Sequence, residues 1–281
     1  MSQAEIGRSP ASERLAAAVY LIGAGPGDPD LLTVKAQQIL QQADLVLVAD
    51  SLVPPQVLQW VRAGVEVVPT AAKTLEDTVP LMIARVQAGQ VVARLQSGDP
   101  SLYSTLHEQL QLLTAAQIPV EVVPGISAFQ AAAARLQIEL TVPELVQTVI
   151  LTRLSSRTPM PATEALAGLA AHRASLCLYL SARQVEQAQI ELLRHYPADT
   201  GVAVCFRLGW PDEKIWVVPL EQISQLTQAQ NLTRTTLYVI SPALNPILNG
   251  TKPDSARSRL YSSSHSRLFR AEPANPDQDQ L

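Results

Sequence analysis

Short apolar runs alternate with longer amphipathic stretches along the first half of the chain. The runs are rich in Val, Leu and Ile and predict buried β-strands at residues 18–23, 44–49, 65–68, 91–95 and 120–123. The stretches between and after them predict helices at residues 30–42, 54–61, 75–88, 101–116 and 127–136. This alternation is typical of a parallel α/β sheet, in which each helix returns the chain to the same edge.

The second half repeats the alternation with one difference. Strands are predicted at residues 147–152, 175–181, 202–208, 213–218 and 236–241. Helices are predicted at residues 162–171, 184–194 and 219–229. The third and fourth of these strands are separated only by the turn sequence GWPDEK, which favours a hairpin and therefore a sheet of mixed strand direction.

The two series predict two α/β domains joined by a linker. The first domain is expected at 18–140, after an N-terminal extension at 1–17. A proline-containing segment at 141–144, TVPE, separates it from a second domain at 145–245 and a tail at 246–281. Small-molecule sites favour clefts between domains, so we expect the site there.

Composition and charge narrow the functional classes. The 281 residues carry a net charge of −4, which argues against non-specific nucleic-acid binding. No apolar run reaches 18 residues, so we expect no membrane span and a cytoplasmic protein. Cys177 and Cys205 lie in apolar runs and are expected to be buried rather than bridged. Four scattered histidines without HExxH predict no metal site.

The sequence YLIGAGPGDPD at 20–30 poses the main functional question. Gly23 and Gly25 fit the dinucleotide fingerprint G-x-G-x-x-G, but Asp28 stands at its third glycine, and an acid there would repel a pyrophosphate. Two further loops of similar design, RLQSGDPSLYS at 94–104 and VVPGISAF at 122–129, also follow strands and precede helices. Three such loops at the carboxyl edge of one sheet predict a pocket lined by backbone.

These three motifs resemble those of the tetrapyrrole methyltransferases, which use S-adenosylmethionine. The resemblance covers about residues 18–270 and implies two αβα domains, with the cofactor in the cleft between them. Two departures stand within it: Ser104, where glycine is expected, and Ala128, where serine or threonine is common. Four further segments resemble the subgroup that methylates C11 of precorrin-4 or cobalt-precorrin-4, namely ADSLV (49–53), QTVILTRLSSRTPMP (147–161), WPDEKI (210–215) and SRLYSSSHSRLFR (258–270).

The resemblance also implies the residues of the site. The cofactor-binding residues are expected to be Pro26, Ser97, Gly98, Asp99, Leu102, Ser127, Ala128, Leu180, Leu208 and Gly209. Glycines let backbone approach a ligand closely, although each of these positions can also be read as a plain turn or packing residue.

The charged candidates each carry two readings. Asp50 is either a catalytic base or, with Ser51, the cap of the helix that starts at Pro54. Asp28 either contacts substrate or caps the following helix. Arg153 and Arg157 either pair with substrate carboxylates, since guanidinium groups bind them bidentately, or are solvated surface charges. Lys35, Lys73 and Arg94 either add positive charge to the lining of the same substrate site or are solvated surface charges.

The implied activity is methyl transfer from S-adenosylmethionine to C11 of precorrin-4 or its cobalt form, on the way to cobalamin. The implied partners are a tetrapyrrole and a second copy of the chain, with S-adenosylhomocysteine as product. Three alternatives stay open. They are methylation of uroporphyrinogen III or precorrin-2, methylation of RNA or a protein, and a non-catalytic subunit that only binds the cofactor.

Overall fold

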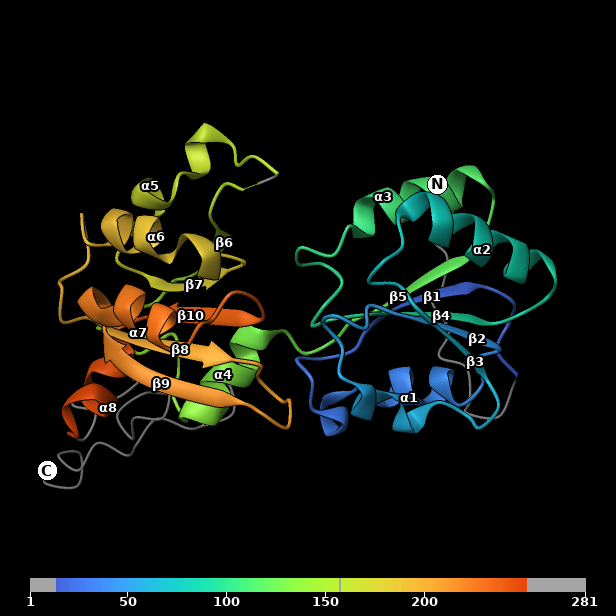
Figure 1. The fold of residues 1–281 in the computed structure, drawn as a ribbon, viewed down its shortest axis with the longest axis horizontal. Helices are drawn as coiled ribbons and strands as arrows, with labels where there is room; N and C mark the ends of the chain where they lie inside the picture. The colour runs from blue at the N-terminus through green and yellow to red at the C-terminus, as the bar shows by residue number, and fades with distance from the viewer. Residues whose placement is uncertain (1–13, 157, 252–281) are drawn as a thin grey trace, which may run out of the picture. The chain divides into compact units, whose positions relative to one another are not determined.

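A computed structural model describes residues 14–156 and 158–251 of the chain (Figure 1). Backbone contacts divide the chain into two units. The first contains Met1–Ala132 and Arg207–Lys214, and the second contains Ala133–Phe206 and Ile215–Leu281. The domain limits expected at 140 and 145 stay a prediction, because a grouping by contacts does not show which segments fold independently.

The first unit is built on a five-stranded parallel sheet. Its strands are β1 (Val19–Gly23), β2 (Leu45–Val48), β3 (Glu66–Pro69), β4 (Val92–Gln96) and β5 (Val120–Val123). The order across the sheet is β3-β2-β4-β1-β5, and every pair is parallel. All five strands were predicted. Their carboxyl ends meet at one edge, so the three Gly-rich loops emerge side by side.

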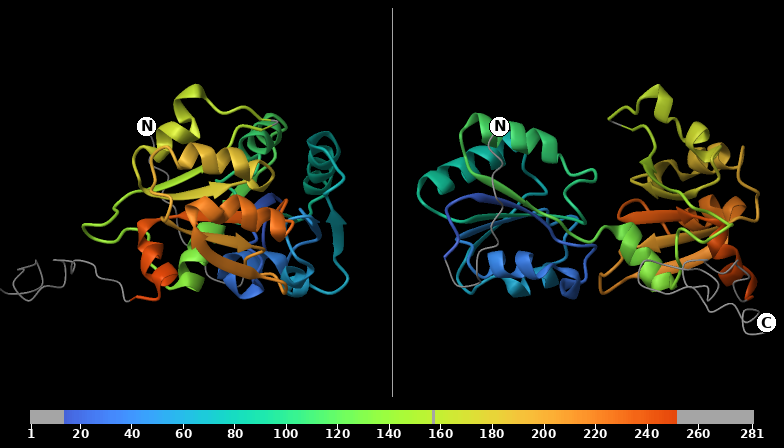
Figure 2. Two further views of the ribbon diagram at one scale, coloured as in Figure 1. Left: turned by 60° about the vertical axis from the view of Figure 1, so that its left-hand side comes forward. Right: turned by 180° about the vertical axis from the view of Figure 1, so that it is seen from behind.

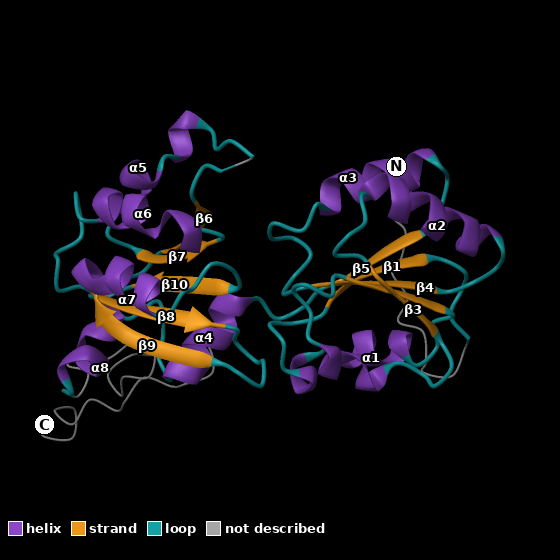
Figure 3. Cartoon of the chain, viewed as in Figure 1, coloured by secondary structure: helices purple, strands orange, loops and turns teal. Residues whose placement is uncertain are grey.

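Helices cover both faces of this sheet, α1 on one and α2 and α3 on the other (Figures 1 and 3). Their limits are α1 (Val34–Leu40), α2 (Leu75–Gln87) and α3 (Leu106–Ala115), with 3-10 turns η1 (Pro29–Leu31) and η2 (Pro55–Trp60). A fourth helix, α4 (Ala128–Leu136), follows the third Gly-rich loop and continues into the second unit, which begins at Ala133. Alternate strand residues serve the two cores: Tyr20 and Ile22 pack with α1, and Val19 and Leu21 with α2 and α3.

Three helix predictions for the first unit need correction. The helix expected at 101–116 begins only at Leu106, because Tyr103 and Thr105 adopt left-handed backbone angles (φ 55° and 58°) that a helix cannot contain. The stretch at 54–61 is a 3-10 turn, η2, that follows Pro54. The helix expected at 30–42 is divided into η1 and α1, and Thr33 caps α1 by accepting from the Ala36 amide at 3.2 Å.

The second unit holds the mixed sheet that the hairpin indicated. Its strands are β6 (Val149–Arg153), β7 (Ser175–Tyr179), β8 (Gly201–Phe206), β9 (Lys214–Pro219) and β10 (Thr236–Ile240), in the order β6-β7-β10-β8-β9. β6 and β7 are parallel, and β10 is antiparallel to β7 and β8. Figure 1 shows β8 and β9 running in opposite directions.

Helices flank this sheet as well. They are α5 (Leu166–Ala170), α6 (Val185–Leu192), α7 (Ile223–Ala229) and α8 (Asn245–Asn249), with 3-10 turns η3 (Ala162–Glu164), η4 (Ala182–Gln184), η5 (Leu220–Gln222) and η6 (Pro242–Leu244). The first three helices share one core with the sheet, and α8 lies on its other side (Figure 2). Cys177 and Cys205 are buried, as predicted. The α/β fold class with two layered units is confirmed.

Candidate active site

The three Gly-rich loops of the first unit meet backbone to backbone. Gly25 and Gly98 form an antiparallel bridge: the Gly25 amide donates to the Gly98 carbonyl at 3.2 Å, and the Gly98 amide to the Gly25 carbonyl at 2.7 Å. A Cβ atom on Gly23 would lie 2.6 Å from Cα of Gly125 and 2.7 Å from the Gly98 carbonyl oxygen. Only glycine permits this approach, so the loops after β1, β4 and β5 form one unit.

Asp99 ties two of these loops together. One carboxylate oxygen accepts from the Gly125 amide at 2.9 Å, and the other accepts from the Ser101 amide at 2.8 Å and from the Ser101 hydroxyl. Burial raises the pKa of Asp99, but the hydrogen bonds from Ser101 and Gly125 outweigh it and lower the pKa overall. The carboxylate is therefore ionised and its hydrogen bonds hold the loop.

Two glutamine side chains hold the loop from 97 to 105 in a backbone conformation that is strained at two residues. The side-chain amides of Gln96 and Gln109 donate to the Ser104 carbonyl at 3.2 and 3.4 Å. Both glutamines are buried. Left-handed angles at Tyr103 and Thr105 cost on the order of 1–3 kcal/mol each, and such strain gathers at functional sites.

The connection between β8 and β9 belongs to the first unit and packs on the GPGDP loop. The Gln56 side chain donates to the Gly27 carbonyl at 3.1 Å and to the Gly209 carbonyl at 2.9 Å. A Cβ atom on Gly209 would collide with the Asp28 amide. The predicted residues Leu208 and Gly209 therefore lie against the turn that contains the buried Pro26.

An aromatic side chain completes this contact. A Cβ atom on Gly27 would lie 2.6 Å from the Trp210 ring, and the Arg207 guanidinium stacks 4.8 Å above the centre of that ring. Arg207 also pairs with Asp212 at 2.6 Å. Sequence reasoning missed Gln56, whose only signal is a polar residue inside a proline-rich apolar segment.

Asp50 stands at the carboxyl end of β2. Its Oδ1 accepts from the Thr70 amide at 2.9 Å and from the Ala71 amide at 2.8 Å, both in the loop after β3. Residue 50 is exposed, and within the described residues Oδ2 has no hydrogen bond. The cap reading is wrong, because η2 has Pro54 at its cap and no side-chain cap bond. The carboxylate is instead anchored by one oxygen and open at the other.

Arg94 lies beneath this edge, on β4. Its Nη1 donates to Thr70 Oγ1 at 2.8 Å, and the Thr70 hydroxyl donates to the Val48 carbonyl at 3.0 Å. Burial lowers the pKa of Arg94 to about 10, and the negative charge of Asp50 opposes that change. Arg94 is therefore a half-buried cation, rather than a solvated surface charge.

Other predicted charged residues have local partners. Asp28 caps η1 by accepting from the Asp30 amide at 3.0 Å, so the capping reading is confirmed. Lys35 pairs with Glu121.

Arg153, at the end of β6, donates to the carbonyls of Leu154 at 3.1 Å, Thr158 at 2.9 Å and Pro159 at 3.4 Å, so its own loop occupies the guanidinium. Arg157 lies outside the described residues. Substrate contacts by these arginines stay predictions.

The remaining predicted cofactor residues divide between the units. Ser127 is buried, its amide donates to Gln130 Oε1 at 2.9 Å, and Ala128 begins α4. Leu102 is half-buried, and its amide donates to the Asp99 carbonyl at 3.2 Å. Leu180 lies in the second unit after β7, 64% exposed and with a left-handed φ of 52°. A large apolar side chain held outward by strained backbone suits a ligand contact.

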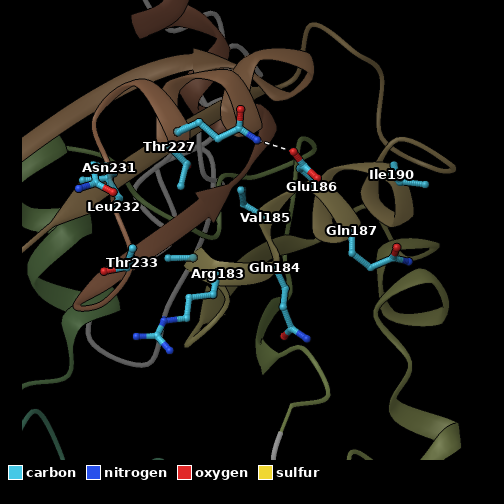
Figure 4. Close-up of a pocket in the computed structure, with 12 residues that line it drawn as sticks. Arg183, Gln184, Val185, Glu186, Gln187, Ile190, Thr227, Asn231, Leu232 and Thr233 are labelled. Atoms are coloured by element: carbon cyan, nitrogen blue, oxygen red, sulfur yellow. Dashed lines mark hydrogen bonds between the residues drawn. The ribbon is translucent and has the colours of Figure 1, made fainter.

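A separate cavity of about 700 Å³ lies in the second unit, lined by residues 182–187, Ile190 and 227–228 with 231–233 (Figure 4). Glu186 hydrogen-bonds Gln228 across it. None of the predicted site residues lines this cavity. In the described part of the chain, no group of three or more His, Cys, Asp or Glu side chains could hold a metal ion, and no helix is long and apolar enough to cross a membrane.

Known proteins match this chain over most of its length. A precorrin-4 C(11)-methyltransferase of Pseudomonas aeruginosa is 44% identical over 252 residues, which cover 90% of this chain and 98% of the relative. The solved structure of a cobalt precorrin-4 methyltransferase is similar with a TM-score of 0.79 and 40% identity, covering 82% of this chain and 97% of the other.

A more distant structure carries a bound ligand. It is a uroporphyrin-III C-methyltransferase of Thermus thermophilus complexed with S-adenosylhomocysteine, 26% identical with a TM-score of 0.67, covering 81% of this chain and 93% of the other. The family of tetrapyrrole (corrin/porphyrin) methylases matches residues 18–224. The three interlocked glycine loops, the two layered units and this match together show that the chain is a member of the tetrapyrrole methylase family.

Proposed function

We propose that this protein transfers a methyl group from S-adenosylmethionine to C11 of precorrin-4 or cobalt-precorrin-4 in cobalamin synthesis. The observation that carries the proposal is the carboxyl edge of the first sheet, where three glycine loops present backbone beside the open carboxylate of Asp50. The similarity to precorrin-4 and cobalt-precorrin-4 C(11)-methyltransferases supports the choice of substrate.

The loops suit a sulfonium cofactor. Backbone at Gly98 has open space beside it, since a Cβ atom there would meet only Cα of Ser127, at 3.8 Å. The ionised Asp99 places negative charge at this edge, which favours a nearby cation. Residues 97–99 and 127–128 would hold the cofactor on this account, with Leu208 and Gly209 packed beside the GPGDP loop.

The chain mainly orients the reactants. S-adenosylmethionine supplies an electrophilic methyl group, and its sulfur leaves with the electron pair of the broken bond. Holding two reactants in line is worth about 7–11 kcal/mol in favourable systems, so no protein nucleophile is needed. The ring carbon supplies the electron pair of the new bond to the methyl group, so the macrocycle gains positive charge. Oδ2 of Asp50 would stabilise that charge or accept the proton that the ring releases.

Replacing Asp50 tests its part in this chemistry. Asp50→Asn keeps an oxygen that can accept from the Thr70 and Ala71 amides but removes the charge, so we expect kcat to fall about 100-fold or more. Steady-state methyl transfer at saturating substrate, followed by mass spectrometry, measures kcat. The matched control is Asp199→Asn at an exposed position of the second unit, where the rate should not change. An Asp50→Asn enzyme with the full rate would remove Asp50 from the mechanism.

The substrate assignment needs a direct assay. Purified protein is incubated with labelled S-adenosylmethionine and with precorrin-4, cobalt-precorrin-4 or uroporphyrinogen III. We expect one added methyl group on a precorrin-4 form, and the faster of the two forms identifies the ring that the protein uses. Methylation of uroporphyrinogen III alone would overturn the C11 assignment and favour the alternative of a uroporphyrinogen methylase. Cofactor binding without transfer to any ring would favour a non-catalytic subunit.

We further propose that the protein acts as a homodimer in the cytoplasm. The resemblance to the methyltransferase family supports this assembly. Light scattering of the purified protein measures its mass directly, and a mass near 30.3 kDa at micromolar concentration would contradict the dimer.

A further inference from the structure

Arg94 is a charged residue at a position of the sheet where apolar side chains are usual. It lies in β4, in register with Leu21 of β1 on one side and Leu47 of β2 on the other, and both leucines are fully buried. A guanidinium among apolar neighbours costs free energy unless polar groups compensate for the water it loses. An apolar side chain would stabilise the sheet more than a guanidinium does, so we expect Arg94 to have a functional role.

Arg94 donates a hydrogen bond to Thr70. Nη1 donates to Thr70 Oγ1 at 2.8 Å, whereas Nε is buried and has no partner among the described residues. Thr70 in turn donates its hydroxyl to the Val48 carbonyl and its amide to Oδ1 of Asp50. Arg94 therefore contacts the residue that anchors Asp50, and its positive charge lies close enough to interact with that carboxylate.

We propose that Arg94 is a positioning residue for Asp50, which rests on the proposed use of Asp50 in methyl transfer. Through Thr70 it fixes the loop after β3 whose amides hold Oδ1. Its charge balances that of Asp50 from beneath the sheet edge, while Oδ2 stays open on the exposed side. The arrangement orients the Asp50 carboxyl group by Oδ1 and leaves Oδ2 open.

A direct role in binding substrate carboxylates is the competing reading. That role would need the guanidinium at the surface with its donors turned outward. Arg94 is instead flanked by buried leucines and donates to a buried threonine. The two readings differ in a measurable way, because a positioning residue acts only while Asp50 is present.

A double-mutant cycle separates them. Kinetic constants are measured for the full-length protein and for Arg94→Met, Asp50→Asn and the double variant, with the tetrapyrrole that the wild type methylates. We expect Arg94→Met to lower kcat about 30-fold, with the KM for S-adenosylmethionine changed by less than about 3-fold. In the Asp50→Asn background the same substitution should lower kcat by less than about 3-fold. Arg94→Lys keeps the charge and should restore kcat to within about 5-fold of wild type.

Two controls keep the result interpretable. Arg62→Met removes the same charge at Arg62, which pairs at 3.6 Å with Asp44 before the start of β2, and should leave kcat unchanged. Circular dichroism checks that each variant folds. Should Arg94→Met fail to fold, Arg94→Gln replaces it in the cycle, because glutamine also removes the charge, and its loss of kcat must again vanish in the Asp50→Asn background.

Equal losses in both backgrounds, no loss at all, or a raised KM for the tetrapyrrole with unchanged kcat would each overturn the proposal. These failures differ from failure of the proposed function, which is read from the wild-type product alone.

Discussion

At the residue scale, the site depends on positions where a side chain would not fit. At Gly125, a Cβ atom would collide with the Gly98 carbonyl oxygen and lie 2.8 Å from the Gly23 backbone. All of these atoms are main chain in three loops that hold one another, so none can move aside alone.

Gly125→Ala therefore should separate the loops. We expect a loss of about 1–3 kcal/mol in the free energy of unfolding and at least a tenfold weaker binding of S-adenosylhomocysteine. Urea unfolding and isothermal calorimetry measure the two effects. The matched control is Gly168→Ala in α5, where a Cβ atom meets nothing within 4 Å, and alanine should be neutral or stabilise by about 0.5–1 kcal/mol. Equal behaviour of the two variants would contradict the interlocked loops.

At the scale of elements, the connection between β8 and β9 leaves its own sheet and packs on the GPGDP loop. One side chain of η2 carries this contact, since Gln56 donates to the carbonyls of both Gly27 and Gly209. The segment predicted to bind cofactor at 208–209 is thereby held at the edge of the first sheet.

Gln56→Leu should release this connection without unfolding the sheet. Without these two hydrogen bonds, the carbonyls of Gly27 and Gly209 must be hydrated instead. We expect the free energy that holds residues 207–214 in place to fall by about 1–3 kcal/mol. Hydrogen exchange followed by mass spectrometry should show faster exchange in 207–214, with β1 and β4 unchanged. The exposed Gln111→Leu serves as control. Unchanged exchange in 207–214 would show that Trp210 packing alone holds the segment.

At the scale of the whole molecule, stability at high pH depends on buried tyrosines of the second unit. Burial raises the pKa of Tyr238 to about 12, and the hydrogen bond with Thr227 opposes this shift only in part. Burial also raises the pKa of Tyr196, whose hydroxyl donates to the Ala174 carbonyl. In the unfolded chain these hydroxyls ionise near pH 10.

The unfolded state therefore holds fewer protons than the folded state between pH 10 and 12, and stability falls as pH rises through that window. Each such tyrosine contributes a slope of about −1.4 kcal/mol per pH unit to the free energy of unfolding. Urea unfolding at pH 9, 10 and 11 measures this slope. Tyr238→Phe loses the Thr227 hydrogen bond at every pH, but its slope above pH 10 should be shallower than that of the wild type. Identical slopes would mean that Tyr238 ionises without unfolding.

The sequence by itself determined the ten strands, the parallel and mixed sheets, and the three loops that carry the site. Strands buried on both faces must be continuously apolar, and turns of this kind require glycine and proline. Both features can therefore be recognised from a short stretch of sequence. The Asp50 candidate also came from local position, at the end of a strand.

Only the tertiary structure decided what each polar group does. Three contacts join residues that are 20 to 153 positions apart in the sequence. They are the anchoring of Asp50 by Thr70, the contact of Arg94 with Thr70, and the docking of 207–214 through Gln56. These hydrogen bonds follow from the order of strands in the sheet, which hydrophobic periodicity does not encode.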